Sequence, residues 1–257
     1  MKTVKDLETG SVKRRLVSMH IGESGSGKTH LAATYPKCFF VITEPNSEET
    51  WMNKPELKAN VVGFEHFIPD KENFKGLFAN LLKEIALAKK MYADGEVETL
   101  VIDNLTYLIH NRWLWLNEFD MRYGKSGEID VQKMYGTLRS WGYDFLLKEV
   151  VSFPGHVVCN VHEMLESDDA MEKKIDKTMT NVPNIIGGLR NEVDGLFSNV
   201  FYLSKLPLGK GQYKYMCRTN KGNGRLAKNR FNLPEIIEDV SYARIMEAMN
   251  KSKGGDK

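Results

Sequence analysis

Eight residues near the start of the chain, GESGSGKT from Gly22 to Thr29, restrict its possible folds more than any other segment. They match the pattern G-x-x-x-x-G-K-[ST], in which glycines allow several backbone N–H groups to turn toward a phosphate. The largely apolar segment 15–22 precedes the motif and predicts a strand, and residues 27–34 predict a helix. Because loops of this pattern join a strand to a helix, the context predicts an α/β fold with a nucleotide-binding loop.

The rest of the chain alternates between strand-like and helix-like segments. Short apolar runs are typical of strands that are buried on both faces, and apolar residues at helical spacing indicate helices. This alternation predicts a mostly parallel sheet flanked by helices, and the last two strands predict an antiparallel hairpin at its edge. The predicted strands are 15–22, 38–43, 60–67, 98–103, 155–163, 196–203 and 213–219, and the predicted helices are 27–34, 73–93, 104–121, 131–151, 184–193 and 239–250.

Length and composition indicate one domain. A chain of 257 residues is enough for one α/β domain with a substantial core, and we expect a flexible arm over residues 1–14, a single domain over 15–250 and a flexible tail over 251–257. No apolar run reaches the roughly 18 residues that span a membrane, and the start lacks the apolar core of a secretory signal, so we expect a cytoplasmic protein. The net charge of +2 excludes a surface that binds nucleic acid everywhere, so any such contact would be local.

Within the glycine-rich loop, two side chains carry the expected chemistry. Lys28 is expected to reach the β- and γ-phosphates, and the hydroxyl of Thr29 to hold Mg²⁺. Asp103 ends the buried strand TLVID, at the edge of an open α/β sheet where ligands bind, and is the predicted second anchor for Mg²⁺. The predicted nucleotide-binding residues of the loop are Gly22, Glu23, Ser24, Gly25, Ser26, Gly27, Lys28, Thr29 and His30.

Hydrolysis of a bound triphosphate also needs a carboxylate that orients water. Glu44 follows the strand at 38–43 and is the predicted base, and Glu163, Glu23 and Glu48 compete for the role. The strand HVVCNVHE ends in Asn160, His162 and Glu163. A polar side chain there, His162 in our prediction, could contact the γ-phosphate and report its presence to the loop that follows.

The base of the nucleotide is predicted by elimination. NKGN at 220–223 is similar to the N-K-x-D tetrad that recognises guanine, but the aspartate is absent. The expected cofactors are therefore ATP and Mg²⁺.

Five segments, taken in order, resemble the RecA-like recombinase core: GESGSGKT, FFVITE, TLVIDNLT, GHVVCNVHE and VPNIIGGLRNEVDGLFSNVFYL. The resemblance covers about residues 15 to 240. It is closest to the small phage-encoded RecA-like ATPases that act as single-strand annealing proteins. It implies a RecA-like P-loop NTPase core, encoded by a phage and working in the cytoplasm of a bacterial host.

The resemblance also implies roles for particular residues. Glu44 matches the catalytic glutamate and Asp103 the Mg²⁺-binding aspartate, and ATP would bind between neighbouring subunits of a ring or filament on single-stranded DNA. A single-strand-binding protein is a further expected partner. Arg218 and Lys221, with Arg225 less favoured, lie in the segment whose basic residues enter the neighbouring subunit's ATP site. The predicted DNA-contacting residues, on loops at about 121–130 and 164–183, are Arg122, Lys125, Lys173, Lys174 and Lys177.

The expected function is thus an ATP- and Mg²⁺-dependent ATPase that binds single-stranded DNA and promotes strand annealing or homologous recombination. One alternative is a nucleotide kinase, against which the absence of arginine from segment 164–183 counts, because kinases close an arginine-rich lid over their substrates. Another is a helicase loader or packaging ATPase, which a protein partner rather than DNA would stimulate.

Overall fold

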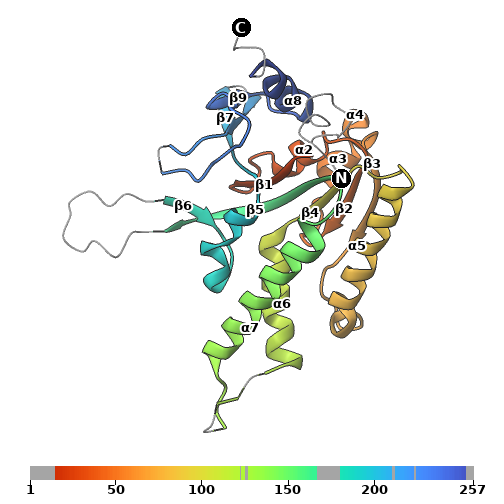
Figure 1. Ribbon diagram of the computed structural model, residues 1–257, viewed down its shortest axis with the longest axis vertical. Helices are drawn as coiled ribbons and strands as arrows, with labels where there is room; N and C mark the ends of the chain where they lie inside the picture. The colour runs from red at the N-terminus through yellow and green to blue at the C-terminus, as the bar shows by residue number, and fades with distance from the viewer. Residues whose placement is uncertain are drawn as a thin grey trace, which may run out of the picture.

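A computed structural model describes residues 15–121, 123–124, 127–166, 180–209, 212–222 and 224–252. Its centre is a sheet with the strand order β3-β2-β4-β5-β1-β7-β8-β9, and β6 pairs with the far end of β5 (Figure 1). The strands from β3 to β7 in this order are parallel, whereas β8, β9 and β6 are antiparallel to their neighbours. The strands are β1 (Val17–Gly22), β2 (Cys38–Ile42), β3 (Val61–His66), β4 (Thr99–Asp103), β5 (His156–Glu166), β6 (Thr180–Pro183), β7 (Asn199–Gly209), β8 (Gln212–Arg218) and β9 (Ile236–Glu238).

Helices cover both faces of this sheet. Figure 1 shows α5, α6 and α7 on one side, with α6 and α7 extending away from the sheet, and α2 and α8 on the other side. Two separate apolar clusters fill the two interfaces, as expected for a parallel sheet that is buried on both faces. The helices are α2 (Lys28–Ala32), α3 (Glu49–Met52), α4 (Pro55–Lys58), α5 (Leu77–Ala93), α6 (Leu105–Phe119), α7 (Val131–Phe145) and α8 (Tyr242–Lys251).

Three helices, α6, α7 and α8, begin where the sequence provides a capping side chain, whereas α5 begins after Gly76 without one. Asn104, Asp130 and Ser241 precede α6, α7 and α8, and each accepts a hydrogen bond from the backbone N–H three residues later. Such a bond satisfies one of the amide groups that a helix start leaves unpaired. The cap on α6 has a functional consequence, because Asn104 follows Asp103 directly and so fixes the end of β4 against the helix.

The predicted fold class, a mostly parallel sheet flanked by helices with an antiparallel edge, is confirmed. The helix predicted at 184–193 is wrong: this segment instead forms two short 3₁₀ turns, at Gly187–Asn191 and Val193–Leu196. Gly187 has a φ of 74°, a left-handed conformation that interrupts an α-helix. The loop predicted at 164–183 is partly wrong, since β5 continues to Glu166 and β6 returns beside it.

Two ends of the chain bear on the domain prediction. Residues 1–14, predicted as a flexible arm, and residues 253–257 of the predicted tail lie outside the described residues. Among the residues that the structure describes, no helix has both the length and the apolar character needed to cross a membrane.

Candidate nucleotide-binding site

The glycine-rich loop joins β1 to α2 at the carboxyl edge of the sheet. Gly25 and Gly27 adopt φ angles of 74° and 95°, in the left-handed region that glycine enters without a steric penalty. At Gly27 a side chain would also collide with another residue, because a Cβ there would lie 2.6 Å from the ring of Tyr215. No side chain caps α2, so the amide groups of its first turn face the loop unobstructed. The loop thus has the glycine conformations and the uncapped helix start that the prediction requires, and phosphate binding by it stays a prediction.

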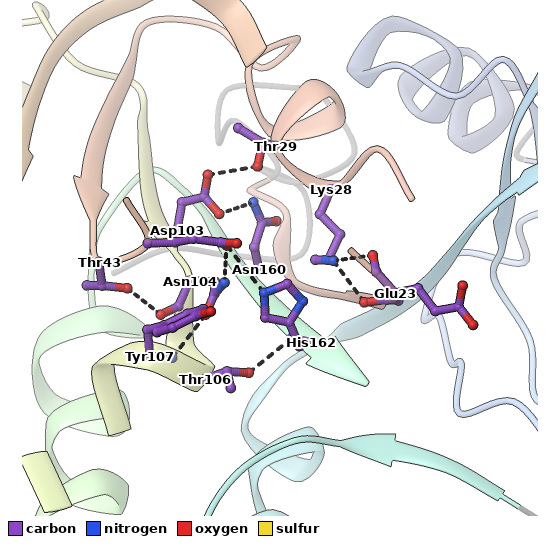
Figure 2. A network of polar contacts seen from close by, with 12 residues as sticks. Glu23, Lys28, Thr29, Thr43, Asp103, Asn104, Thr106, Tyr107, Asn160 and His162 are labelled. Carbon is purple, nitrogen blue, oxygen red and sulfur yellow. Dashed lines mark hydrogen bonds and ion pairs between the residues drawn. The ribbon is translucent and has the colours of Figure 1, made fainter. Parts of the chain in front are cut away.

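Lys28 lies folded over this loop. Its Nζ donates hydrogen bonds to the backbone carbonyls of Gly22 and Glu23, at 2.8 Å and 2.7 Å (Figure 2). The side chain is 6% exposed, and burial lowers the pKa of Lys28 to about 8, although the carboxylates of Asp103 and Glu44 act in the opposite direction. The ammonium group is thus held beside the loop, within reach of a phosphate bound there.

Asp103 lies at the end of β4 and is 1% exposed. Its Oδ2 accepts a hydrogen bond from Oγ1 of Thr29 at 2.9 Å, and its Oδ1 accepts one from Nδ2 of Asn160 at 3.0 Å (Figure 2). Burial raises the pKa of Asp103, while the hydrogen bonds from Asn160 and Thr29 lower it. Thr29 and Asp103, predicted from distant segments as two anchors for one ion, are therefore in contact.

The donor set at this point fits Mg²⁺. A carboxylate and a hydroxyl are hard oxygen ligands, and Mg²⁺ in nucleotide sites is held by one or two such groups together with phosphate oxygens. The hydroxyl of Ser26, in the adjoining loop, is buried and has no hydrogen-bond partner, which is consistent with an acceptor that a bound phosphate would supply. We conclude that Thr29 and Asp103 would hold the ion.

Glu44 lies two residues beyond β2, facing the same cleft. Its Oε2 is 3.3 Å from Nε2 of His162, and it also accepts a hydrogen bond from Nδ2 of Asn104. Burial by itself would raise the pKa of Glu44, but His162, Lys28 and Asn104 together hold it below its ordinary value. The carboxylate is thus ionised and oriented near the loop, although its predicted role as base stays a prediction.

His162 is fixed from its backbone as well as from its ring. Its N–H donates a hydrogen bond to Oγ1 of Thr106 at 3.0 Å, which ties the end of β5 to the start of α6 (Figure 2). The ring, meanwhile, contacts Glu44. Two of the three competing glutamates contact other residues, since Glu163 accepts a hydrogen bond from Tyr202 at 3.1 Å and Glu48 lies 3.4 Å from His66. The third, Glu23, lines a second cleft beside the loop.

Lys28, Thr29, Glu44 and His162 line one cleft. Two aromatic rings, those of His30 and Tyr215, line it as well. The rings of His30 and Tyr215 are stacked with centroids 5.5 Å apart and an interplanar angle of 18°, and Nζ of Lys54 lies 3.4 Å from Nδ1 of His30. Burial, and after it the charge of Lys54, lowers the pKa of His30. The residues lining the cleft are Ser24, Gly25, Gly27, Lys28, Thr29, His30, Glu44, Pro45, Asn46, Ser47, Thr50, Lys54, His162 and Tyr215.

Sequence reasoning missed Tyr215 and Lys54. The alternation of Tyr213 and Tyr215 indicated a strand, but it did not indicate which residues lie beside that strand. β8 reaches the glycine-rich loop only through its pairing with β7, which the local sequence does not reveal. Lys54 follows α3, a short helix without a periodic pattern that would have revealed it. Neither residue carries a local signal for nucleotide binding.

The predicted basic residues behave differently from one another. Arg218 forms an ion pair with Glu235, and Lys221 is exposed; neither lines the cleft. Arg225, the less favoured candidate, lies closer to the glycine-rich loop. Its guanidinium is 4.5 Å from the ring of Tyr202, in a second cleft that Glu23, Ser24 and Gly25 also line. The predicted DNA-contacting residues Arg122, Lys125, Lys173, Lys174 and Lys177 lie outside the described residues.

Together, the fold and the cleft define a class of protein, the P-loop ATPase domain. A family model described as an AAA domain matches residues 14–231, and the chain therefore belongs to this AAA domain family. None of the curated proteins matches the chain.

Two solved structures illustrate what the chain is similar to. One is the assembled ATPase EscN from the enteropathogenic E. coli type III secretion system, with 14% identity, a TM-score of 0.42, and coverage of 74% of this chain and 43% of that one. The other is a prototypical ATPase from the type III secretion system of pathogenic bacteria, with 15% identity, a TM-score of 0.45, and coverage of 73% and 51%. The chain thus spans about half the length of these structures.

Proposed function

We propose that this chain is an ATP- and Mg²⁺-dependent ATPase that binds single-stranded DNA and promotes strand annealing or homologous recombination. One observation carries the ATPase part: Lys28, Thr29, Glu44 and His162, from three separate segments, line one cleft, and Asp103, from a fourth segment, accepts a hydrogen bond from Thr29. These are the groups that phosphoryl transfer to water requires, namely a cation for the phosphates, a metal anchor and an oriented carboxylate.

Each group has a definite task in this proposal. Backbone N–H groups of the loop and the ammonium group of Lys28 bind and orient the phosphates. Glu44, held by His162 and Asn104, accepts a hydrogen bond from the attacking water and later its proton. When bound, Mg²⁺ supplies charge neutralisation on the β- and γ-phosphate oxygens.

The DNA part of the proposal rests on the ordered motif set and on the position of β5. His162, in contact with Glu44, stands four residues before the end of β5, and the segment that follows β5 carries Lys173, Lys174 and Lys177. A change at His162 on binding of a γ-phosphate would therefore act on a strand that leads directly into a lysine-rich segment. Lysines there would neutralise DNA phosphates.

The proposal includes a homo-oligomer with ATP bound between subunits, in which residues 15–250 of each copy form the ATPase domain. Arg218, Lys221 and Arg225 are the candidates for the cation that enters the neighbour's site. Arg218 would have to leave Glu235 to do so, whereas Lys221 is exposed already. A single-strand-binding protein is a further partner in this proposal.

The decisive experiment measures ATP hydrolysis with and without single-stranded DNA, together with DNA binding in the presence of a non-hydrolysable ATP analogue. We expect DNA to bind in the nucleotide-bound state and to stimulate turnover. Lys28→Ala should abolish nucleotide binding and both DNA effects, and Lys148→Ala, on an exposed helix surface, serves as the control. Hydrolysis that DNA does not change, with no DNA binding, would refute the DNA part alone; transfer of phosphate to nucleoside monophosphates would indicate a kinase.

A further inference from the structure

Three polar side chains stand in a row across the centre of the sheet. In the strand register His20 of β1 is the partner of Asn160 of β5, and Ile102 pairs with Cys159, so Asp103 of β4 is level with Asn160 on its other side. Register partners in a sheet place their side chains on the same face. The three are buried, at 0%, 0% and 1% exposure, so each needs hydrogen-bond partners inside the protein.

The direction of the hydrogen bonds in this row can be deduced. Asp103 accepts a hydrogen bond from Nδ2 of Asn160. The amide oxygen Oδ1 of Asn160 therefore points away from Asp103. That Oδ1 is buried and lacks a partner that meets standard hydrogen-bond geometry, and the same is true of Nδ1 of His20. Burial lowers the pKa of His20 to about 3, against smaller raising effects of the neighbouring Asn160 side chain and of the Lys28 backbone, so the ring is neutral.

The far side of the imidazole is occupied by a hydroxyl chain. Nε2 of His20 lies 3.2 Å from Oγ of Ser18, which in turn lies 3.4 Å from the hydroxyl of Tyr35. A neutral imidazole carries a proton on one nitrogen and accepts at the other. The same Oγ of Ser18 also lies 3.3 Å from the carbonyl oxygen of Val157, to which its single proton can go instead. An amide oxygen can only accept, so a hydrogen bond from His20 to Asn160 puts the proton on Nδ1 and leaves Nε2 to accept from Ser18.

We infer that His20 is a positioning residue for the Mg²⁺ site: its Nδ1–H holds the amide of Asn160, and Asn160 holds the carboxylate of Asp103 in the orientation that meets Thr29. The physical reason is that an amide can rotate by half a turn. Without a donor at His20, Asn160 could turn its oxygen toward Asp103, which would replace a hydrogen bond by repulsion between an oxygen and a carboxylate. Partners behind a metal ligand of this kind typically change metal affinity by about 10- to 100-fold when they are removed.

Two substitutions of His20 separate this role from simple packing. In His20→Asn the new amide nitrogen lies near the position of Nδ1, so Asn160 keeps a hydrogen-bond donor. In His20→Gln the new amide nitrogen lies near the position of Nε2, so Asn160 loses its donor. The measurement is the affinity for ATPγS by calorimetry, once with Mg²⁺ and once with EDTA. The inference rests on the proposed ATPase function, so the wild-type protein must show Mg²⁺-dependent binding.

We expect His20→Gln to weaken Mg²⁺-dependent binding by about 10-fold while binding in EDTA stays unchanged, and His20→Asn to retain the Mg²⁺ dependence. An unchanged Mg²⁺ dependence in His20→Gln overturns the inference, and so does an equal loss in both variants. Absence of Mg²⁺-dependent binding in the wild type would instead contradict the proposed function.

A second measurement reads the tautomer directly in the wild-type protein. With ¹⁵N-labelled histidine, the ring nitrogens of His20 should report a protonated Nδ1, with the signal assigned by its loss in either variant or, if neither folds, by through-space contacts of the ring with Tyr35 and Phe201. A protonated Nε2 overturns the inference whatever the protein's activity.

Discussion

Glu44 depends on its neighbours for both its charge and its direction. His162 in β5 and Asn104, directly after β4, each contact its carboxylate. Burial by itself would raise the pKa of Glu44, and these contacts, with Lys28, hold it below its ordinary value. A residue of this kind should affect the chemical step much more than it affects binding.

For Glu44→Gln we therefore expect ATP hydrolysis to fall by about 10²- to 10⁴-fold, with ATP affinity changed little. Gln has the same shape and can still meet Asn104 and His162, but it cannot take a proton from water. Phosphate release and calorimetric binding measure the two quantities. Glu48→Gln, which lies beside His66 instead, is the matched control and should hydrolyse ATP normally.

Tyr215 presents a different case, because it faces the cleft without any chemical role. Its ring lies against Gly27 and is stacked on His30, and it lines the same cleft as Glu44. A flat ring at that position suits the nucleoside end of the ligand, since aromatic stacking on a base contributes about 1–3 kcal/mol.

Tyr215→Ala should thus weaken ATP binding by about 5- to 150-fold, the equivalent of that stacking energy, but should leave tripolyphosphate binding unchanged. Competition binding with the two ligands measures this difference. Tyr215→Phe keeps the ring and should bind ATP like the wild type. Equal weakening of both ligands in Tyr215→Ala would mean that the ring supports the loop and does not contact the nucleoside.

At the scale of the elements, the side chain of Arg112 contacts aromatic rings from each of the helices α5, α6 and α7, which form one layer. The guanidinium of Arg112 on α6 lies 4.9 Å, 4.2 Å and 4.9 Å from the rings of Phe78, Trp115 and Trp141, which belong to α5, α6 and α7. Each such contact favours the cation over an aliphatic chain when water is partly excluded. The arrangement fixes how the three helices pack on the sheet.

We expect Arg112→Ala to lower the free energy of unfolding by about 1–3 kcal/mol, through lost cation–π contacts and lost packing of the side-chain stem. Urea denaturation measures this quantity. Lys148→Ala removes an exposed ion pair with Asp144 on the same layer and should cost less than about 0.5 kcal/mol. If Arg112→Ala lowered the free energy of unfolding by no more than Lys148→Ala does, the structural role of the contacts between Arg112 and the three rings would be contradicted.

For the whole molecule, strand order decides how the site and the core are connected. β5 lies between β1 and β4, so the glycine-rich loop and Asp103 are separated by one strand. Asn160, a polar residue of β5, therefore lies between Asp103 on one neighbouring strand and the buried His20 on the other. The molecule as a whole consequently carries a buried neutral imidazole, which makes its stability dependent on pH.

The sign of this dependence follows from His20, whose pKa is lowered from 6.5 to about 3 on folding. Above pH 6.5 neither state binds the proton, and below it the unfolded state binds more protons than the folded state. Stability should therefore fall as the pH drops from 6.5 toward 3, by at most about 1.4 kcal/mol per pH unit from this residue.

Thermal unfolding from pH 7 to pH 4 measures this effect. In His20→Gln the fall should be shallower than in the wild type, because Gln does not titrate. Parallel curves for the two proteins would show that the ring is protonated without cost and is not enclosed as the structure indicates.

The amino-acid sequence by itself determined the features that depend on neighbours along the chain. The pattern GESGSGKT, with its strand and helix, predicted the loop, and strands ending in Asp103 and Glu44 predicted two further groups, of which the structure places Asp103 against Thr29 and Glu44 in the cleft. Such predictions succeed because glycine conformation, apolar periodicity and the common carboxyl edge of parallel strands are local or general properties.

Only the tertiary structure decided which distant side chains meet. The placement of Tyr215 over Gly27, of Arg225 rather than Arg218 beside the loop, and of His20 level with Asn160 all depend on strand order and register. A shift of one residue in the register of β8 or β1 would turn Tyr215 or His20 to the opposite face. Register is set by the packing of the whole sheet between its two helical layers, and no segment of the sequence carries that information alone.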